Sequence, residues 1–290
     1  MKRSVPCIIS LRLVLSLAAS GCSYFSSQQK QPQAGASDGG RIGQAHQTEK
    51  QIEPYPILGA SNKLTAKERS SMNKWREDIV QVAGHNPGEV FINGPSSVKA
   101  VCLTFDDGPD GVFTPKVLDI LKQYGVHGSF FFIGQRVKNY PAVVRRADRE
   151  GNLVLNHTWD HKDLSHLSDL AIRNEITMTG DEIASITGKR PALVRPPYGA
   201  VNDRVIRDLQ GGNCKIAIWS IDTLDWSQKD KANIARNVMD NVRPGDIILM
   251  HSNAGRQATV DALPAIITGL QAEGYGFLTL ADMLNVPAYQ

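Results

Sequence analysis

One aspartate and two histidines of this sequence have the side-chain types that hold a catalytic divalent metal ion: Asp107, His157 and His161. Two imidazoles and one carboxylate leave coordination positions free for water and substrate, which is typical of catalytic rather than structural zinc. The four-residue step between the histidines would place both on one side of a helical turn. Two packing or surface histidines are the alternative, and the aspartate pair upstream favours the metal site.

A bound divalent ion activates water and polarises a carbonyl, and amide hydrolysis also needs a base for the water and an acid for the departing amine. Asp106 is the candidate base and His251 the candidate acid. Arg195 beside Asp106 would keep it ionised, and Asp225 beside His251 would favour the imidazolium. A structural ion pair and a helix-capping aspartate are the alternative roles of Arg195 and Asp225.

These polar residues come directly after short apolar runs that predict strands. The runs are Ala100 to Phe105, Gly128 to Ile133, Asn152 to Leu155, Ala192 to Val194, Lys215 to Ile221, Asp246 to Met250 and Gly276 to Thr279. Helical patterns lie between them, at Pro115 to Tyr124, Pro141 to Glu150, Leu170 to Thr187 and Leu263 to Glu273, each followed or closed by a glycine. Alternation of this kind predicts an α/β fold, either a parallel barrel or an open parallel sheet. In a barrel the strand ends meet, so these residues would converge on one rim.

A further helix is predicted before the first strand. Thr65 and Glu68 have the spacing of a capping box, and the apolar residues that follow lie on one helical face as far as Val82, before Gly84 ends the pattern. The segment is too short for a core of its own, so it is expected to pack on the barrel. It has no functional assignment from the sequence.

Five segments together resemble the motifs of the polysaccharide deacetylase family, also called the NodB-homology domain or carbohydrate esterase family 4. In order, they are Thr104-Phe105-Asp106-Asp107-Gly108-Pro109, His157-Thr158-Trp159-Asp160-His161, Arg195-Pro196-Pro197-Tyr198-Gly199, Asp222-Thr223-Leu224-Asp225-Trp226 and Leu249-Met250-His251. The resemblance extends over roughly residues 99–284.

The resemblance implies a distorted (β/α)7 barrel and one divalent ion, with zinc favoured over cobalt, nickel and manganese, on the three residues named first. It gives Asp106, His251, Arg195 and Asp225 the same catalytic roles as the chemistry above. It adds three substrate contacts: the backbone N–H of Tyr198 at the oxyanion, and Trp226 with Leu249 lining the acetyl pocket.

The first residues predict export. Two cationic residues precede an apolar run, and Ala19-Ser20-Gly21-Cys22 resembles a lipobox in which Cys22 becomes the lipid-bearing N-terminus. Cleavage to a soluble secreted protein and an uncleaved anchor are the alternatives, and all three place the domain outside the cytoplasmic membrane.

The sequence after Cys22 is rich in Ser, Gln, Gly and Ala and nearly free of large apolar residues, so it predicts a disordered tether. The predicted organisation is a lipoprotein signal peptide at 1–21, a flexible tether at 22–60, an extension with a helix and lead-in at 61–96, and a catalytic domain at 97–286.

Two of the four cysteines, Cys102 and Cys214, belong to the predicted domain and sit in apolar runs. Buried thiols are favoured there over a disulfide, which an exported protein could also form.

The composition argues against a nucleic-acid partner, because the net charge is only +3 and there is no long Lys/Arg run. The expected partners are an N-acetylated polysaccharide and, through the lipid, a membrane; no protein partner is predicted. The expected activity is metal-dependent removal of acetyl from N-acetylglucosamine units, with peptidoglycan favoured. Deacetylation of chitin or exopolysaccharide, hydrolysis of xylan acetyl esters, and a silent glycan-binding lipoprotein are the alternatives.

Overall fold

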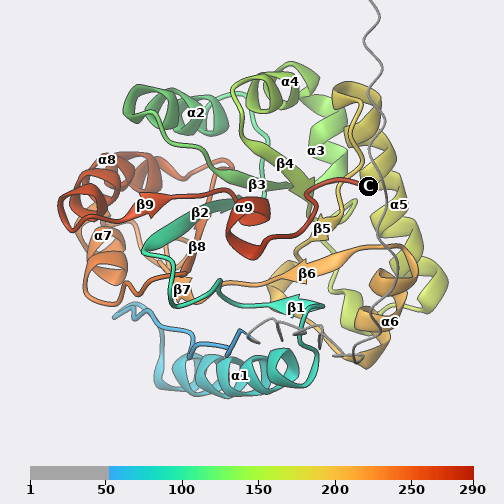
Figure 1. Ribbon diagram of the computed structural model, residues 1–290, viewed down its shortest axis with the longest axis horizontal. Helices are drawn as coiled ribbons and strands as arrows, with labels where there is room; N and C mark the ends of the chain where they lie inside the picture. Colours follow the sequence, from blue (N-terminus) through green and yellow to red (C-terminus); the bar gives the residue numbers. More distant parts are fainter. Residues whose placement is uncertain (1–51) are drawn as a thin grey trace, which may run out of the picture. The chain divides into compact units, whose positions relative to one another are not determined.

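The computed structural model describes residues 52–290. Their strands form one parallel sheet in the order β1-β6-β5-β4-β3-β2-β8-β7, and β9 also pairs with β2. The strands are β1 (Val90–Phe91), β2 (Ala100–Asp106), β3 (Ser129–Phe132), β4 (Leu153–Asn156), β5 (Leu193–Val194), β6 (Lys215–Ala217), β7 (Ile221–Asp222), β8 (Ile247–His251) and β9 (Gly276–Phe277). The sheet curls into a distorted barrel of the (β/α)7 type, as predicted, with its strands in the centre of Figure 1 and the longer helices around them.

The fifth predicted strand, Lys215 to Ile221, is wrong as one element, because it is split into β6 and β7. β6 pairs with β5 and β1, whereas β7 pairs with β8. The chain between them crosses from β6, which lies beside the edge strand β1, to β7 at the other edge, and no ladder joins β1 to β7 in the described chain. Leu58 lies at this opening and forms a parallel bridge with Ile221.

The helices are α1 (Ala66–His85), α2 (Phe113–Tyr124), α3 (Gly134–Asn139), α4 (Pro141–Arg149), α5 (Asp169–Thr187), α6 (Asp203–Gly211), α7 (Lys231–Met239), α8 (Gln257–Ala272) and α9 (Leu280–Leu284). The capping box of α1 forms as predicted, but the helix continues through Gly84 to His85. Glycine in a helix costs only about 1 kcal/mol relative to alanine, so packing overrides it. Helix α8 begins six residues before the predicted Leu263 and contains Pro264. None of the helices in residues 52–290 combines the length and apolar character needed to cross a bilayer.

Alternation along β2 separates the core from the site. Val101, Leu103 and Phe105 pack in a cluster with side chains of α2 and α8. Residues on the other face, including Cys102, Thr104 and Asp106, point into the barrel, because successive strand residues face opposite sides. Cys102 and Cys214 are both buried free thiols, which confirms the prediction.

The two segments that flank the predicted domain are more closely joined to it than expected. Ile57 is buried and Tyr55 N–H donates to Asn93, so residues 52–60 belong to the folded part rather than to a tether. β1 adds a strand from the predicted lead-in, and Tyr289 bridges to Pro191, beyond the predicted end at 286. The signal peptide, Cys22 and residues 22–51 of the predicted tether lie outside the described residues.

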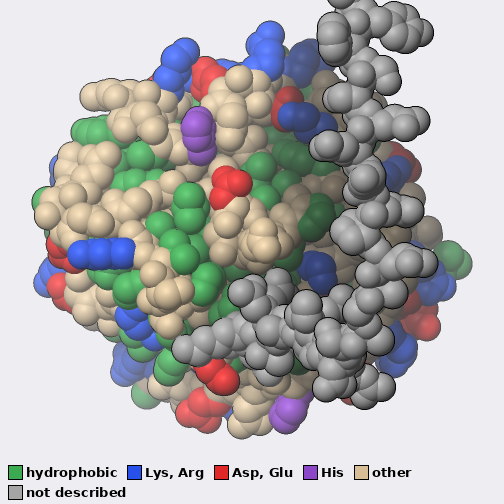
Figure 2. Space-filling model, in the orientation of Figure 1, with side chains coloured by type: hydrophobic (Ala, Val, Ile, Leu, Met, Phe, Trp, Pro, Cys, Tyr) green, Lys and Arg blue, Asp and Glu red, His purple; other side chains and the backbone are tan. Residues whose placement is uncertain are grey.

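Helix α9 closes the end of the barrel at which the strands begin. Its Leu280 N–H donates to the Ser129 hydroxyl at the first residue of β3 (3.1 Å). Figure 2 looks onto this end, where hydrophobic side chains lie in the middle and charged ones mostly towards the rim. The residues predicted to do chemistry are at the opposite ends of the strands.

Candidate active site

The strand ends bring the predicted acid and base together. Asp106 and His251 are the last residues of β2 and β8, and they are register partners in adjacent parallel strands. His157 follows β4, Arg195 follows β5, and Asp225 lies three residues beyond β7. The predicted convergence on one rim is therefore confirmed.

Arg195 is fully buried and its guanidinium is held from several sides. Nη1 donates to Asp106 Oδ1 at 2.8 Å and to Thr104 Oγ1 at 2.9 Å. Nε and Nη2 donate to backbone carbonyls at 2.9 and 2.7 Å, and the guanidinium lies 4.2 Å from the centre of the Phe131 ring. This arrangement fixes the Asp106 carboxylate, because both partners of a buried ion pair need such additional bonds.

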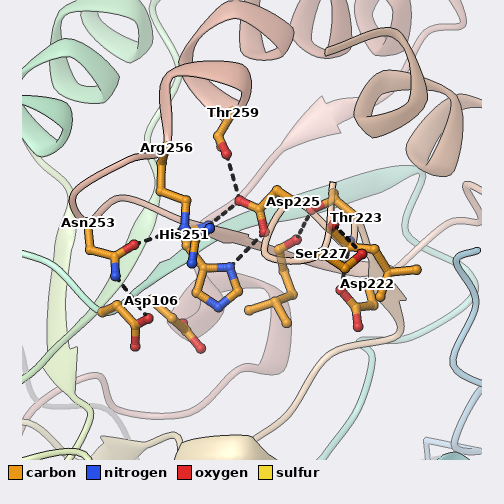
Figure 3. Close-up of polar contacts among 12 residues, drawn as sticks. Asp106, Asp222, Thr223, Asp225, Ser227, His251, Asn253, Arg256 and Thr259 are labelled. Atoms are coloured by element: carbon orange, nitrogen blue, oxygen red, sulfur yellow. Dashed lines mark hydrogen bonds and ion pairs between the residues drawn. The ribbon is translucent and has the colours of Figure 1, made fainter. Parts of the chain in front are cut away.

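His251 is held by Asp225 through two hydrogen bonds, as Figure 3 shows. Its Nδ1 is 2.7 Å from Asp225 Oδ1, and its backbone N–H donates to Oδ2 at 2.9 Å. Thr259 donates a further bond to Oδ2 at 2.7 Å. Burial alone would lower the pKa of His251, but the charge of Asp225 and its hydrogen bond raise it to about 9. His251 is thus kept in the form that can give up a proton.

Asp107, His157 and His161 gather as the metal prediction requires, since one ligand atom from each lies within 4.8 Å of the other two. The Nε2 atoms of His157 and His161 are 3.4 and 3.1 Å from Asp107 Oδ1. The predicted helical turn between the histidines is wrong: Thr158 and His161 have positive φ values (66° and 65°), and the segment is a loop after β4. Left-handed residues turn the chain back, which brings the two imidazoles together without a helix.

The surroundings of this cluster fit a cation. Oδ1 of Asp107 is buried and has no hydrogen-bond partner among the described residues. Burial alone would raise the pKa of Asp107, but the neighbouring His157 and His161 hold it well below its usual range, so the oxygen is charged. His157 Nδ1 lies 2.7 Å from the Arg195 carbonyl oxygen, which fixes the tautomer and leaves Nε2 free to bind.

The three residues expected to contact substrate lie in different surroundings. Tyr198 has a positive φ (61°), its ring meets His161 edge-on with centroids 4.9 Å apart, and no backbone carbonyl of residues 52–290 accepts from its N–H. Leu249 is buried. Trp226 is 45% exposed and lines a cavity with Leu64 and Met72, so α1 shares this side of the rim.

Three further residues of the site were not predicted from the sequence. Asn253 Nδ2 donates to Asp107 Oδ2 at 3.3 Å, and Arg256 Nε donates to Asn253 Oδ1 at 3.0 Å. Thr259 supports Asp225 from α8, as described above. Asn253 lies two residues beyond His251, so its place after a strand end was a signal that could have identified it. Arg256 and Thr259 carried no comparable signal.

Comparisons with known proteins agree with this geometry. The family model described as polysaccharide deacetylase matches residues 93–215. A peptidoglycan-N-acetylglucosamine deacetylase of Bacillus cereus is 40% identical over 195 residues, which cover 67% of this chain and 71% of that protein. The chain belongs to the polysaccharide deacetylase family. It is therefore a hydrolase of carbon–nitrogen bonds.

Two further similarities extend the comparison. The peptidoglycan-N-acetylmuramic acid deacetylase PdaC of Bacillus subtilis is 39% identical over 188 residues, 65% of this chain and 39% of that protein. The crystal structure of the Bc1960 peptidoglycan N-acetylglucosamine deacetylase superposes with a TM-score of 0.68 at 37% identity, covering 69% of this chain and 95% of that one. The deacetylase fold is thus shared with enzymes whose names specify peptidoglycan.

Proposed function

We propose that this deacetylase removes the acetyl group from N-acetylglucosamine units of peptidoglycan, releasing acetate and leaving a free amine on the sugar. The observation that carries the proposal is that two buried ion pairs, Asp106 with Arg195 and His251 with Asp225, lie on the same rim as the three-ligand cluster. The relatives named for peptidoglycan support the choice of polymer.

Asp107, His157 and His161 would hold the divalent ion. Two imidazole nitrogens and a carboxylate oxygen suit zinc, and cobalt, nickel and manganese accept the same ligands. When bound, the ion supplies Lewis-acid polarisation and makes water easier to deprotonate.

The residues of the chain would then carry the protons. Asp106 takes a proton from the attacking water as the oxygen bonds to the carbonyl carbon, and the Tyr198 N–H donates to the oxygen that becomes negative. His251 next gives its proton to the sugar nitrogen as the C–N bond breaks, so that the neutral amine and acetic acid leave. The acid then ionises to acetate, and Asp106 and His251 return to their starting forms by losing and regaining a proton to and from solvent. Arg195 keeps Asp106 ionised at the start, and Asp225 keeps His251 protonated.

We place the acetyl methyl group against Leu249 and Trp226. Leu249 is buried below the rim, while the partly exposed Trp226 offers an aromatic face to a sugar chain.

Zinc-dependent acetate release is the direct test of the proposed function, with N-acetylglucosamine oligomers and purified peptidoglycan as substrates and the described chain with and without zinc. Acetate release from peptidoglycan that is lost when zinc is removed supports the proposal. Release from acetylated xylan alone would overturn it in favour of an esterase.

We also propose that the chain is exported and anchored by a lipid on Cys22, with the signal peptide at 1–21 removed. The order of cationic residues, apolar run and Ala19-Ser20-Gly21-Cys22 supports this placement, in which the anchored domain faces the cell envelope. Incorporation of labelled fatty acid into the full chain, but not into its Cys22→Ala variant, is expected. Labelling of neither, with the protein in the medium, would instead indicate a secreted form.

A further inference from the structure

Helix α1 lies outside the part of the chain matched by the family model, which begins at residue 93. It nevertheless packs against the rim that carries the site. Figure 1 shows it along one side of the barrel, next to β1. Its partly buried tryptophan, Trp75, contacts the turn Pro197–Gly199, on which Tyr198 lies.

The contact between Trp75 and this turn is both polar and steric. Trp75 Nε1 donates to the carbonyl oxygen of Gly199 at 3.2 Å. A Cβ atom built on Gly199 would lie only 2.4 Å from Cζ2 of the Trp75 ring, so the indole fills the space beside a glycine with a φ of 61°. Residue 199 therefore has to be glycine both for its backbone and for the ring that covers it.

Trp75 is also linked to the proposed base, Asp106, through the Trp219 ring and Arg195. The Trp75 and Trp219 ring centroids are 5.3 Å apart, and the Arg195 guanidinium lies 5.5 Å from the Trp219 centroid. Arg195 holds Asp106.

The next residue of α1, Arg76, ties the helix to the segment that runs beside β7. Its Nη1 donates to the Gly59 carbonyl at 3.0 Å, and the preceding Leu58 bridges to Ile221 of β7. Burial raises the pKa of Asp222, the last residue of β7, to about 6, and the charge of Arg76 opposes that rise. The helix thus bonds to the turn that presents the proposed oxyanion donor, and the charge of Arg76 acts on the strand end that leads to Asp225.

We propose that Trp75 is a positioning residue of the reaction, which holds the Tyr198–Gly199 turn so that the Tyr198 N–H faces the oxyanion. This inference rests on the deacetylase function proposed above. Tyr198 has a positive φ, which a bulky residue rarely adopts on its own, and the Gly199 that follows is conformationally free. A hydrogen bond to the Gly199 carbonyl and a ring packed on its Cα supply the missing constraint, and both come from α1.

The test compares Trp75→Phe with Tyr55→Phe. The first variant keeps an aromatic ring and removes the N–H that bonds to Gly199. The matched control also removes one side-chain bond to a backbone carbonyl, that of the Tyr55 hydroxyl to Pro244 (3.0 Å), away from the site. In Trp75→Phe we expect kcat for peptidoglycan deacetylation to fall about three- to tenfold, as for the loss of one hydrogen bond, with KM changed by less than about twofold.

Two readouts separate positioning from simple stability. A methylphosphonate analogue of the tetrahedral intermediate should bind Trp75→Phe more weakly by the same factor as kcat falls, while the affinity for the deacetylated product, a glucosamine oligomer, stays the same. Hydrogen exchange of the Gly199 and Ala200 amides, which bond to Pro196 and Pro197, should be faster in Trp75→Phe than in the control.

The outcomes distinguish this inference from the proposed function. Acetate release by the wild type, with Trp75→Phe equal to Tyr55→Phe in kcat, analogue binding and exchange, would overturn the positioning role alone. A zinc-loaded, folded wild type that releases no acetate from any N-acetylated polymer would overturn the deacetylase proposal and this inference together.

Discussion

Asp106 and Asp107 are neighbours in the chain and have opposite surroundings. Asp106 ends β2, is 3% exposed, and is bonded to a guanidinium that also donates to three other acceptors. Asp107 begins the following loop with a φ of 67°, and one of its oxygens has no partner among the described residues although it is buried. The Asp106 carboxylate has its partners within the protein, whereas the Asp107 carboxylate has an oxygen available to bind a cation.

The same contrast holds for the two regions of the site. The proton-transfer region, Asp106 with Arg195 and His251 with Asp225, consists of completed pairs in which losing one partner would cost about 3 to 5 kcal/mol. The proposed metal region differs. Its ligand atoms, on Asp107, His157 and His161, lie close together, but Asp107 Oδ1 has no hydrogen-bond partner among the described residues. A bound cation would supply the missing interaction. Fixed ion pairs suit groups that transfer protons, and a carboxylate oxygen without a protein partner suits a metal ligand.

Substituting the two aspartates separately is the sharpest way to break this comparison. We expect Asp107→Asn to lose zinc and more than about a thousandfold of activity, because a ligand to the ion is gone. Asp106→Asn should keep zinc and lose about a hundred- to ten-thousandfold, the usual effect of removing a general base. Zinc content by atomic spectroscopy and acetate release from the same samples measure both effects.

The exposed Asp78→Asn on α1 serves as the control and should change neither quantity. If Asp106→Asn lost zinc as completely as Asp107→Asn, both carboxylates would belong to the metal site, and the division into two regions would be wrong.

The next largest effect concerns the pH dependence of the acid. Asp225 raises the pKa of His251, so Asp225→Asn should lower that pKa towards its ordinary value of 6.5. Since His251 acts in its protonated form, activity declines as pH rises through this pKa, and the alkaline limb should move to lower pH. At pH 8 we expect about a tenfold or greater loss of kcat, smaller at pH 6. A pH profile of kcat for both proteins measures the shift, and an unchanged alkaline limb would assign that limb to another group.

The same ion pair affects the stability of the metal-free protein. His251 has a folded-state pKa of about 9, above its ordinary 6.5. Its contribution to the free energy of unfolding is therefore complete below pH 6.5 and is lost as pH rises through about 9. Denaturant titrations across this window should show the decline in the wild type and a smaller one in Asp225→Asn.

The parts of the fold that could be predicted from the sequence are those with a local signal. The strand-end positions of Asp106, His157, Arg195 and His251 followed from apolar runs that end in a polar residue. The capping box of α1 was equally local. Because parallel strands end on one rim, strand ends alone were sufficient to bring these residues together.

The remaining features depend on contacts distant in sequence. β1 has two residues, too few for any periodicity, and exists because it pairs with β6. The break between β6 and β7 reflects the opening of the curled sheet. The positive φ of His161 and the contact of Trp75 with Gly199 are imposed by packing, which the residue types do not reveal.

Asn253 was also not predicted from the sequence. It belongs to the metal region without being a ligand, so its substitution tests the boundary between the two regions and has the smallest expected effect. Its amide donates to Asp107 Oδ2 at 3.3 Å and is itself held by Arg256. Removing a bond that orients a ligand usually weakens metal binding about tenfold or more, so Asn253→Ala should release zinc at about tenfold lower chelator concentration. With saturating zinc its kcat should stay near that of the exposed control Asn73→Ala. A low kcat that zinc cannot restore would instead place Asn253 with the proton-transfer groups, and the boundary between the two regions would have to move.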